Sequence, residues 1–134
     1  MNLRRTNGPG SPLTPEDRRR PGEVRRVGRA HANLWGFGAC ADAVGLCLSE
    51  LITNGFVHGD GNVGVQMWST TTQLCIEVSS SGPQRVPMPP IAVDLLEEGG
   101  RGLMLVDAHA DAWGVAEDGL RTTWWCAFAG GGGQ

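Results

Sequence analysis

The stretch that most constrains the fold is residues 49–59, Ser-Glu-Leu-Ile-Thr-Asn-Gly-Phe-Val-His-Gly. Within it Glu50, Asn54 and His58 recur every four residues, so on a helix they lie along one flank. The neighbouring apolar positions form a stripe about 100° wide that would face a core, namely Val44, Cys47, Leu48, Leu51 and Gly55. The pattern therefore predicts a helix packed on a core. Polar residues at the border of its stripe are placed to line a cleft.

The polar residues of this flank indicate two kinds of chemistry. Glu50 can take a proton or orient a nucleophile. Asn54 offers a neutral oxygen, a hard ligand that suits Mg²⁺ and suits soft metals poorly. On this stretch alone, a surface helix with ordinary polar residues is the favoured interpretation.

Charge is unevenly spread along the 134 residues, a length that fits one domain with one core. Residues 1–29 hold eight of the eleven arginines against three acids, a net of +5, whereas residues 30–134 carry a net of −8. We interpret residues 1–22, rich in Pro, Gly and Arg, as a disordered basic arm. Such an arm can bind nucleic acid or neutralise its own domain, and without interleaved aromatics the nucleic-acid role is the less favoured.

The four cysteines form no C-x-x-C pair, so neither a zinc site nor a redox motif is expected. The arginines near the N-terminus are followed by no apolar run, and we find no apolar stretch of about 18 residues. These features predict a cytoplasmic protein with reduced cysteines and no membrane partner.

Periodicity and turn signals predict the order of the elements. We expect helices at 23–37, 40–58 and 103–109, strands around 63–67, 74–78, 113–115 and 120–128, and a long Pro-rich loop at 83–98. This order predicts an α+β, two-layer sandwich with helices on one face of a mostly antiparallel sheet. The domain would span residues 23–128, and residues 129–134 would form a flexible Gly-rich tail.

The segment Gly99-Gly100-Arg101-Gly102 opens the third helix. Glycines let the backbone approach a ligand, and the free N–H groups and dipole of a helix start favour an anion. Arg101 can add a charged contact to phosphate. A Walker-type loop is excluded because the chain has no Lys, and position 105 is Leu where a dinucleotide fingerprint needs Gly.

Taken in order, these motifs resemble the GHKL (histidine kinase and Hsp90-like) ATPase family, whose ATP-binding domain has the Bergerat fold. The likeness covers residues 23–128 and is greatest to the anti-sigma-factor serine/threonine kinases and related ATP-binding regulators of actinobacteria. It rests on Ser-Glu-Leu-Ile-Thr-Asn at 49–54, Ser-Gly-Pro at 81–83, Gly-Gly-Arg-Gly-Leu at 99–103, Trp-Gly-Val at 113–115 and Thr-Thr-Trp at 122–124.

The resemblance implies a role for each matching position. Glu50 corresponds to the family's catalytic base and Asn54 to its Mg²⁺ ligand. Gly100 and Gly102 match the glycines that hold the phosphates, with Arg101 between them, and Gly82 matches the glycine beside the adenine. The family's Asp-x-Gly, whose acid contacts the adenine amino group, is here Ser80-Ser81-Gly82, so Ser80 stands in place of the acid.

The resemblance thus implies ATP and Mg²⁺ as cofactors and a sigma factor or an anti-anti-sigma (antagonist) protein as partner, with a homodimer also possible. Two functions stay open. The first is a protein serine/threonine kinase acting on the antagonist. The second is a binding module that sequesters its partner without phosphoryl transfer, which the loss of the acid at Ser80 favours.

Overall fold

A computed structural model describes residues 1–4, 14–58, 62–81 and 101–130 of the chain. Its helices are α1 (Pro15–Leu34), the 3₁₀ turn η1 (Gly38–Cys40), α2 (Ala41–His58) and α4 (Arg101–His109). Its strands are β1 (Asn2–Arg4), β2 (Asn62–Ser69), β3 (Gln73–Ser81), β4 (Ala112–Glu117) and β5 (Arg121–Ala129).

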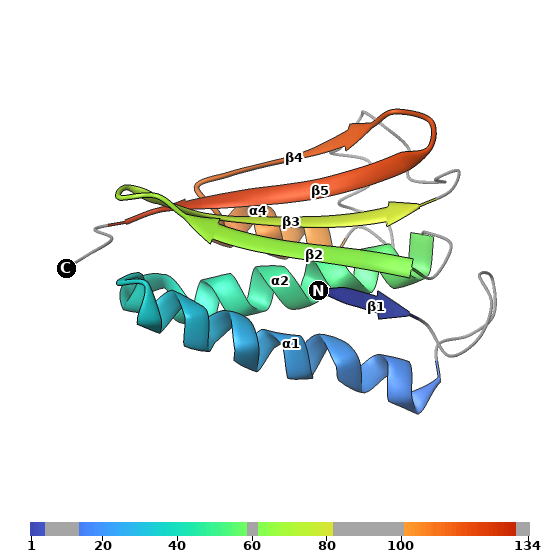
Figure 1. Ribbon diagram of the computed structural model, residues 1–134, viewed down its shortest axis with the longest axis horizontal. Helices are drawn as coiled ribbons and strands as arrows, with labels where there is room; N and C mark the ends of the chain where they lie inside the picture. Colours follow the sequence, from blue (N-terminus) through green and yellow to red (C-terminus); the bar gives the residue numbers. More distant parts are fainter. Residues whose placement is uncertain (5–13, 59–61, 82–100, 131–134) are drawn as a thin grey trace.

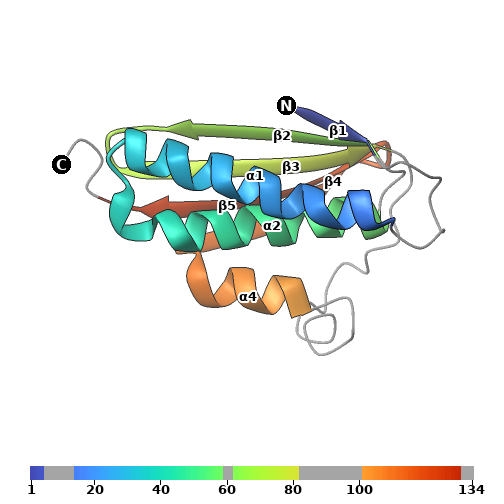
Figure 2. The same ribbon diagram turned by 90° about the horizontal axis from the view of Figure 1, so that it is seen from below.

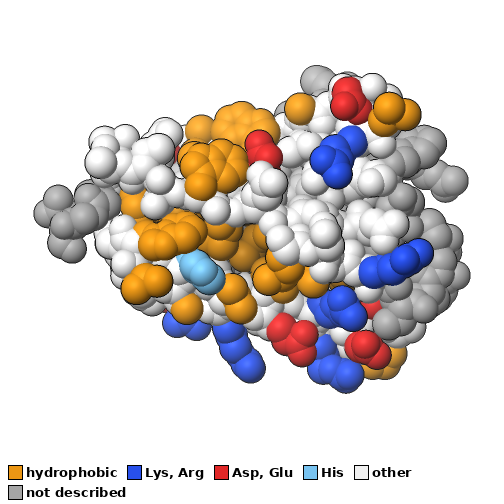
Figure 3. Space-filling view, in the orientation of Figure 1, with side chains coloured by type: hydrophobic (Ala, Val, Ile, Leu, Met, Phe, Trp, Pro, Cys, Tyr) orange, Lys and Arg blue, Asp and Glu red, His pale blue; other side chains and the backbone are white. Residues whose placement is uncertain are grey.

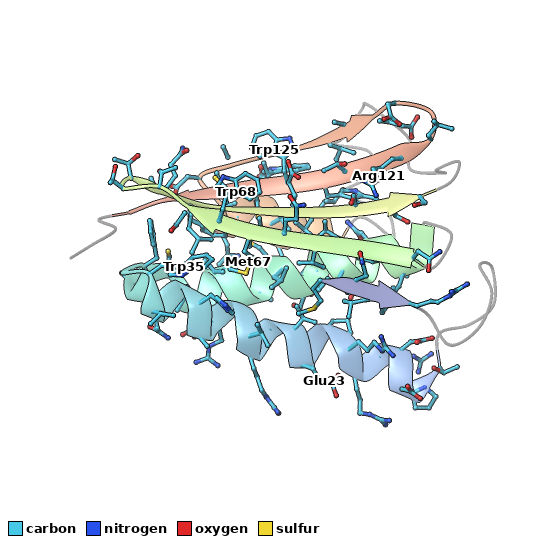
Figure 4. All side chains as sticks on the ribbon, in the orientation of Figure 1. Glu23, Trp35, Met67, Trp68, Arg121 and Trp125 are labelled. Carbon is cyan, nitrogen blue, oxygen red and sulfur yellow. The ribbon has the colours of Figure 1, made fainter. Side chains whose placement is uncertain are left out.

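The strands form one antiparallel sheet in the order β1-β2-β3-β5-β4. Helices α1, α2 and α4 lie side by side on one face of this sheet (Figures 1 and 2). The predicted two-layer α+β sandwich is therefore confirmed. Trp68 and Trp125 project from the opposite face of the sheet, which no described helix covers (Figure 4).

Helix α1 begins at Pro15, eight residues before the expected start, because local signals other than periodicity define its N-terminus. Thr14 caps the helix by accepting a hydrogen bond from the backbone N–H of Asp17 at 3.1 Å. Pro15 occupies the first turn, where its missing N–H costs nothing, and the helix continues through Pro21. The expected arm over 1–22 is thus partly wrong, since Asn2–Arg4 is a strand and 15–22 is helix; residues 5–13 lie outside the described chain.

Helix α2 is the central element of the core and matches the expected helix to within one residue. The predicted stripe packs against the sheet, with Val44, Cys47, Leu48 and Leu51 fully buried. The stretch Gly38–Val57, of mean hydropathy 1.3, is long and apolar enough to cross a membrane by those measures alone, contrary to our expectation from the sequence. Its burial between sheet and helices accounts for that composition.

Two antiparallel hairpins, β2–β3 and β4–β5, form four strands of the sheet. In the first, Val65 of β2 lies opposite Val78 of β3, and alternate residues of both strands enter the core. In the second, Gly119 turns the chain with φ of 87°, and Asp118 accepts backbone hydrogen bonds from Leu120 at 2.9 Å and Arg121 at 2.8 Å. These bonds lower the pKa of the Asp118 carboxyl below its ordinary value.

Two other sequence predictions concern the cysteines and the segments at the ends of β3 and β5. Cys47 and Cys126 are fully buried, as small apolar side chains often are, whereas Cys40 and Cys75 are only partly buried. The Pro-rich loop 83–98 lies outside the described residues, as do residues 131–134 of the predicted tail.

Candidate functional site

Two of the predicted site residues lie one turn apart on α2. Glu50 is half-buried and Asn54 is 5% exposed, on the part of the helix next to α4. The two neighbouring hydroxyl groups form hydrogen bonds within α2. Thr53 donates to the Ser49 carbonyl at 3.0 Å, and Ser49 donates to the Leu46 carbonyl at 2.8 Å. Glu50 and Asn54 are therefore the polar groups that this helix presents towards α4.

The start of α4 lies directly against these two side chains. A Cβ atom placed on Gly102 would lie 2.9 Å from Glu50 Oε1, 3.5 Å from Glu50 Cβ and 3.7 Å from Asn54 Oδ1. Glycine leaves the Glu50 carboxylate in this position, whereas any larger residue would displace the end of that side chain. The structure thus brings three of the predicted residues together at the N-terminus of a helix.

The environment of Glu50 alters its acidity. Partial burial raises the pKa of the Glu50 carboxyl above its ordinary value, and the Arg25 guanidinium acts in the opposite direction. Arg25 comes from α1, whose close packing on α2 is set by Gly45: a Cβ there would lie 3.0 Å from Arg25 Cγ. A carboxylate whose pKa is raised is a stronger base once it is ionised, which suits it to accept a proton.

A second group of polar side chains lies where β3 ends and β5 begins. Ser80 and Thr122 are opposite each other in the register, and both are buried on the helix-covered side, with exposures of 1% and 0%. The Thr122 hydroxyl donates to Glu117 Oε2 of β4 at 3.3 Å. That bond uses the Thr122 proton, which leaves the Thr122 oxygen to act as an acceptor.

Trp124 lies next to Thr122 on the same face of β5. Its indole is 1% exposed, and within the described part of the chain its Nε1–H has no hydrogen-bond partner. A buried donor of this kind costs free energy unless a ligand or water satisfies it. The helix-covered side of the sheet at Ser80 and Thr122 therefore offers a ligand one acceptor and one donor. The acceptor is the Thr122 oxygen, oriented by Glu117, and the donor is the Trp124 indole N–H.

Both groups lie in the half of the molecule in which α2 and β3 end and α4 and β5 begin (Figures 1 and 2). Gly82 and Gly100 lie outside the described residues, as do the side chains of Arg101 and His58. Their predicted roles remain predictions.

Sequence reasoning missed Arg25, Thr122 and Glu117 as parts of this end of the molecule. In the sequence, Arg25 contributed only to the net charge of residues 1–29. Glu117 directly precedes the Asp118-Gly119 turn, and nothing in that position indicated a functional role. Thr122 did carry a signal, since it is a polar residue at an inward position of an alternating strand.

The protein groups at this site do not form a metal centre by themselves. Among the described residues, no three His, Cys, Asp or Glu side chains are grouped to hold a metal ion. Mg²⁺, however, usually takes few protein ligands and completes its shell with water and substrate phosphates. The Asn54 oxygen beside the α4 N-terminus fits Mg²⁺ in that form.

The model of a protein family described as the histidine kinase-like ATPase domain matches residues 14–125 of the chain. This range includes both polar groups, and it begins at Thr14, where α1 is capped. A comparison with curated proteins gives no match.

Proposed function

The chain belongs to the histidine kinase-like ATPase domain family, which implies that it binds ATP, and we propose that it uses ATP and Mg²⁺ to phosphorylate a serine or threonine of an antagonist protein in sigma-factor regulation. The observation that carries the proposal is the approach of Gly102 to Glu50 and Asn54. This approach supports the proposal because a carboxylate that can act as a base and a hard oxygen ligand then lie beside a helix start, where an anion is favoured.

Each residue then has a definite task. Glu50 accepts the proton of the substrate hydroxyl, for which its raised pKa is suited. The backbone N–H groups at the start of α4 would hold the terminal phosphates, and the Asn54 oxygen would be a ligand of Mg²⁺. Bound Mg²⁺ supplies charge neutralisation, and phosphoryl transfer depends mainly on such neutralisation and on positioning.

Adenine would be held at the ends of β3 and β5. Ser80 occupies the position of the family's acid and supplies a neutral oxygen, while the Thr122 oxygen adds an acceptor oriented by Glu117. Two neutral acceptors suit the amino group of adenine, although each contributes less than a carboxylate.

The second candidate is a binding module that sequesters its partner without transferring phosphate. The absence of an acid at Ser80 favours it, because weak base binding would make phosphoryl transfer inefficient. Glu50 and Asn54 favour the kinase, since a module without catalysis has no need of both.

Calorimetric titration with ATP separates the two functions. The kinase requires heat of binding with Mg²⁺ and little with EDTA, and Asn54→Ala should abolish that difference. Thr53→Ala is the matched control, because the Thr53 hydroxyl bonds within α2. No heat at millimolar ATP would refute the kinase and support sequestration.

Transfer of labelled phosphate from ATP to an anti-anti-sigma protein tests the chemical step. Glu50→Ala should keep nucleotide affinity and lower the transfer rate by about 10²–10⁴-fold. An unchanged rate would remove Glu50 from the mechanism.

A further inference from the structure

Two exposed tryptophans lie on the face of the sheet that no described helix covers. Trp68 of β2 is 41% exposed and Trp125 of β5 is 37% exposed. Figure 3 shows hydrophobic side chains gathered on this face with an acidic side chain beside them, and Figure 4 places both tryptophans there. Exposed tryptophans are typical of surfaces that bind another molecule.

The indole of Trp125 is held against the neighbouring strand. Gly114 of β4 is its partner in the register, and a Cβ atom on Gly114 would lie 2.8 Å from both Nε1 and Cζ2 of the indole. The ring therefore lies over β4, in the space that the glycine leaves, instead of extending away from the sheet. One side of the ring contacts the strand, and the other side is open to a ligand.

A carboxylate lies next to this ring on the same face. Glu77 of β3 is opposite Trp125 in the register, and Cys75 of the same strand is opposite Trp68. Glu77 is thus the direct cross-strand neighbour of one tryptophan and the diagonal neighbour of the other. Within the described part of the chain it forms no salt bridge, and Arg121, on the same face of β5, lies four residues before Trp125.

An indole beside a carboxylate matches a guanidinium group better than other cations. A guanidinium is planar and weakly hydrated, so it can stack on the ring and donate two hydrogen bonds to the carboxylate. An ammonium group is compact and more strongly hydrated. From these observations we propose that this face binds an arginine side chain of a partner protein, with the guanidinium on Trp125 and its N–H groups bonded to Glu77. The residues next to that arginine cover Trp68.

The position of Arg121 favours a separate protein over a second copy of this chain. A two-fold axis that laid Arg121 of the second copy on Trp125 would have to cross the strands at Thr123, midway between these two residues. Trp68 lies in a row of the sheet four residues beyond Thr123, so it would face the level of Gly119, in the turn before β5. A second copy would thus leave Trp68 exposed, whereas a segment of another protein can cover both tryptophans.

The test uses the full chain and three blocked peptides, Gly-Arg-Gly, Gly-Lys-Gly and Gly-citrulline-Gly. NMR follows the indole N–H of Trp125 and the backbone amides of β3 and β5. The arginine peptide should shift these signals saturably, with a Kd of about 1–10 mM. The lysine peptide should bind more weakly, and the citrulline peptide, which keeps the shape of arginine without its charge, should not bind.

Two variants test the two halves of the site. Glu77→Gln should weaken binding of the arginine peptide about fivefold or more, because a neutral acceptor replaces the carboxylate. Trp125→Leu, followed at the backbone amides, should weaken it about two- to fivefold through loss of the stacked ring. Glu23→Gln is the matched control, since it removes an exposed carboxylate of α1, away from this face (Figure 4), and should leave binding unchanged.

Absence of shifts at tens of millimolar peptide overturns the proposal, as do equal shifts with all three peptides or equal effects of Glu77→Gln and Glu23→Gln. A single-stranded oligonucleotide that shifts Trp125 more strongly than the arginine peptide also overturns it, in favour of nucleic acid. A dimer in sedimentation that Trp125→Leu dissociates overturns it in favour of a second copy. The face lies on the side of the sheet opposite α2 and α4, so Glu77→Gln should leave ATP binding unchanged and Asn54→Ala should leave peptide binding unchanged.

Discussion

Gly102 offers the most direct test of the site, because a single methyl group there must displace the Glu50 carboxylate. The Cβ of Gly102→Ala would lie 2.9 Å from Glu50 Oε1, closer than real Cβ contacts. Ordinary contact needs about 3.5–4.0 Å, so the carboxylate must move by about 0.5–1 Å. It can do so at little cost, because it is the far end of a flexible side chain.

The displacement should therefore affect catalysis more than folding. A misplacement of about 1 Å can cost about 10²-fold in rate, so we expect Gly102→Ala to lower phosphoryl transfer by about 10–100-fold. The bulkier Gly102→Val should also keep phosphates from the backbone of α4 and abolish ATP binding. Both variants should remain folded by circular dichroism.

The assay combines calorimetry with ATP, labelled phosphoryl transfer and circular dichroism. Met104→Ala and Met104→Val are the matched controls, since Met104 lies in the same helix and is 46% exposed. Normal ATP affinity in Gly102→Val would place the phosphates elsewhere. Normal transfer in Gly102→Ala would show that the position of the Glu50 carboxylate does not limit the reaction.

Two further predictions concern charge and packing. Arg25 lowers the pKa of Glu50, and the ionised Glu50 carboxylate is the proposed base. Arg25→Ala should therefore move the acid limb of the transfer rate to higher pH, whereas Arg29→Ala should not. A Cβ on Gly55 would lie 2.8 Å from Val63 Cγ2, so overpacking of about 1–3 kcal/mol should outweigh the helix-propensity gain of about 1 kcal/mol, and Gly55→Ala should destabilise the fold in urea. The same change in a Val63→Ala background should be neutral or stabilising, and equal effects in both backgrounds would refute the packing argument.

The sequence predicted the fold well where local patterns determine structure. Burial requires apolar residues at every second position of β2 and β3 and along one stripe of α2. These periodic patterns, together with the turn signals between the elements, were therefore enough to locate them. The start of α1 was missed because residues 15–22 have few apolar positions, and a cap and a proline define the helix there. A strand of three residues at Asn2–Arg4 has too short a pattern to recognise.

The candidate residues could be picked out from the sequence only where they share an element or a motif. Glu50 and Asn54 followed from helical spacing, and Gly102 from the glycines before a helix. Arg25 and Glu117 act across helices or across strands, and their contacts depend on packing that a linear pattern does not contain. For the same reason, no pattern in the sequence indicated that Gly102 lies against Glu50.

The last prediction concerns Ser80, which occupies the position of an acid in the family that the sequence resembles. A carboxylate contributes about 1.5–3 kcal/mol to a hydrogen bond, against about 0.5–1.5 for a neutral acceptor, so ATP should bind about 5–30-fold more weakly than with Asp. Ser80→Asp should therefore tighten ATP and widen its margin over GTP, whose ring carries a carbonyl oxygen in place of the amino group. The parent should discriminate poorly between the two purines.

The structure also indicates that Ser80→Asp should destabilise the fold when no nucleotide is bound. Ser80 is 1% exposed, so an Asp there is desolvated until the amino group of adenine reaches it. Ser80→Asp should thus lower the melting temperature without nucleotide, and ATP should raise it by more than in the parent. Ser79→Asp is the control, because this neighbour faces the open side of the sheet. A parent that is already strongly ATP-selective, with ATP affinity equal to that of Ser80→Asp, would show that Ser80 does not contact the base. Thr122 with Glu117 would then be the better candidate for reading the amino group.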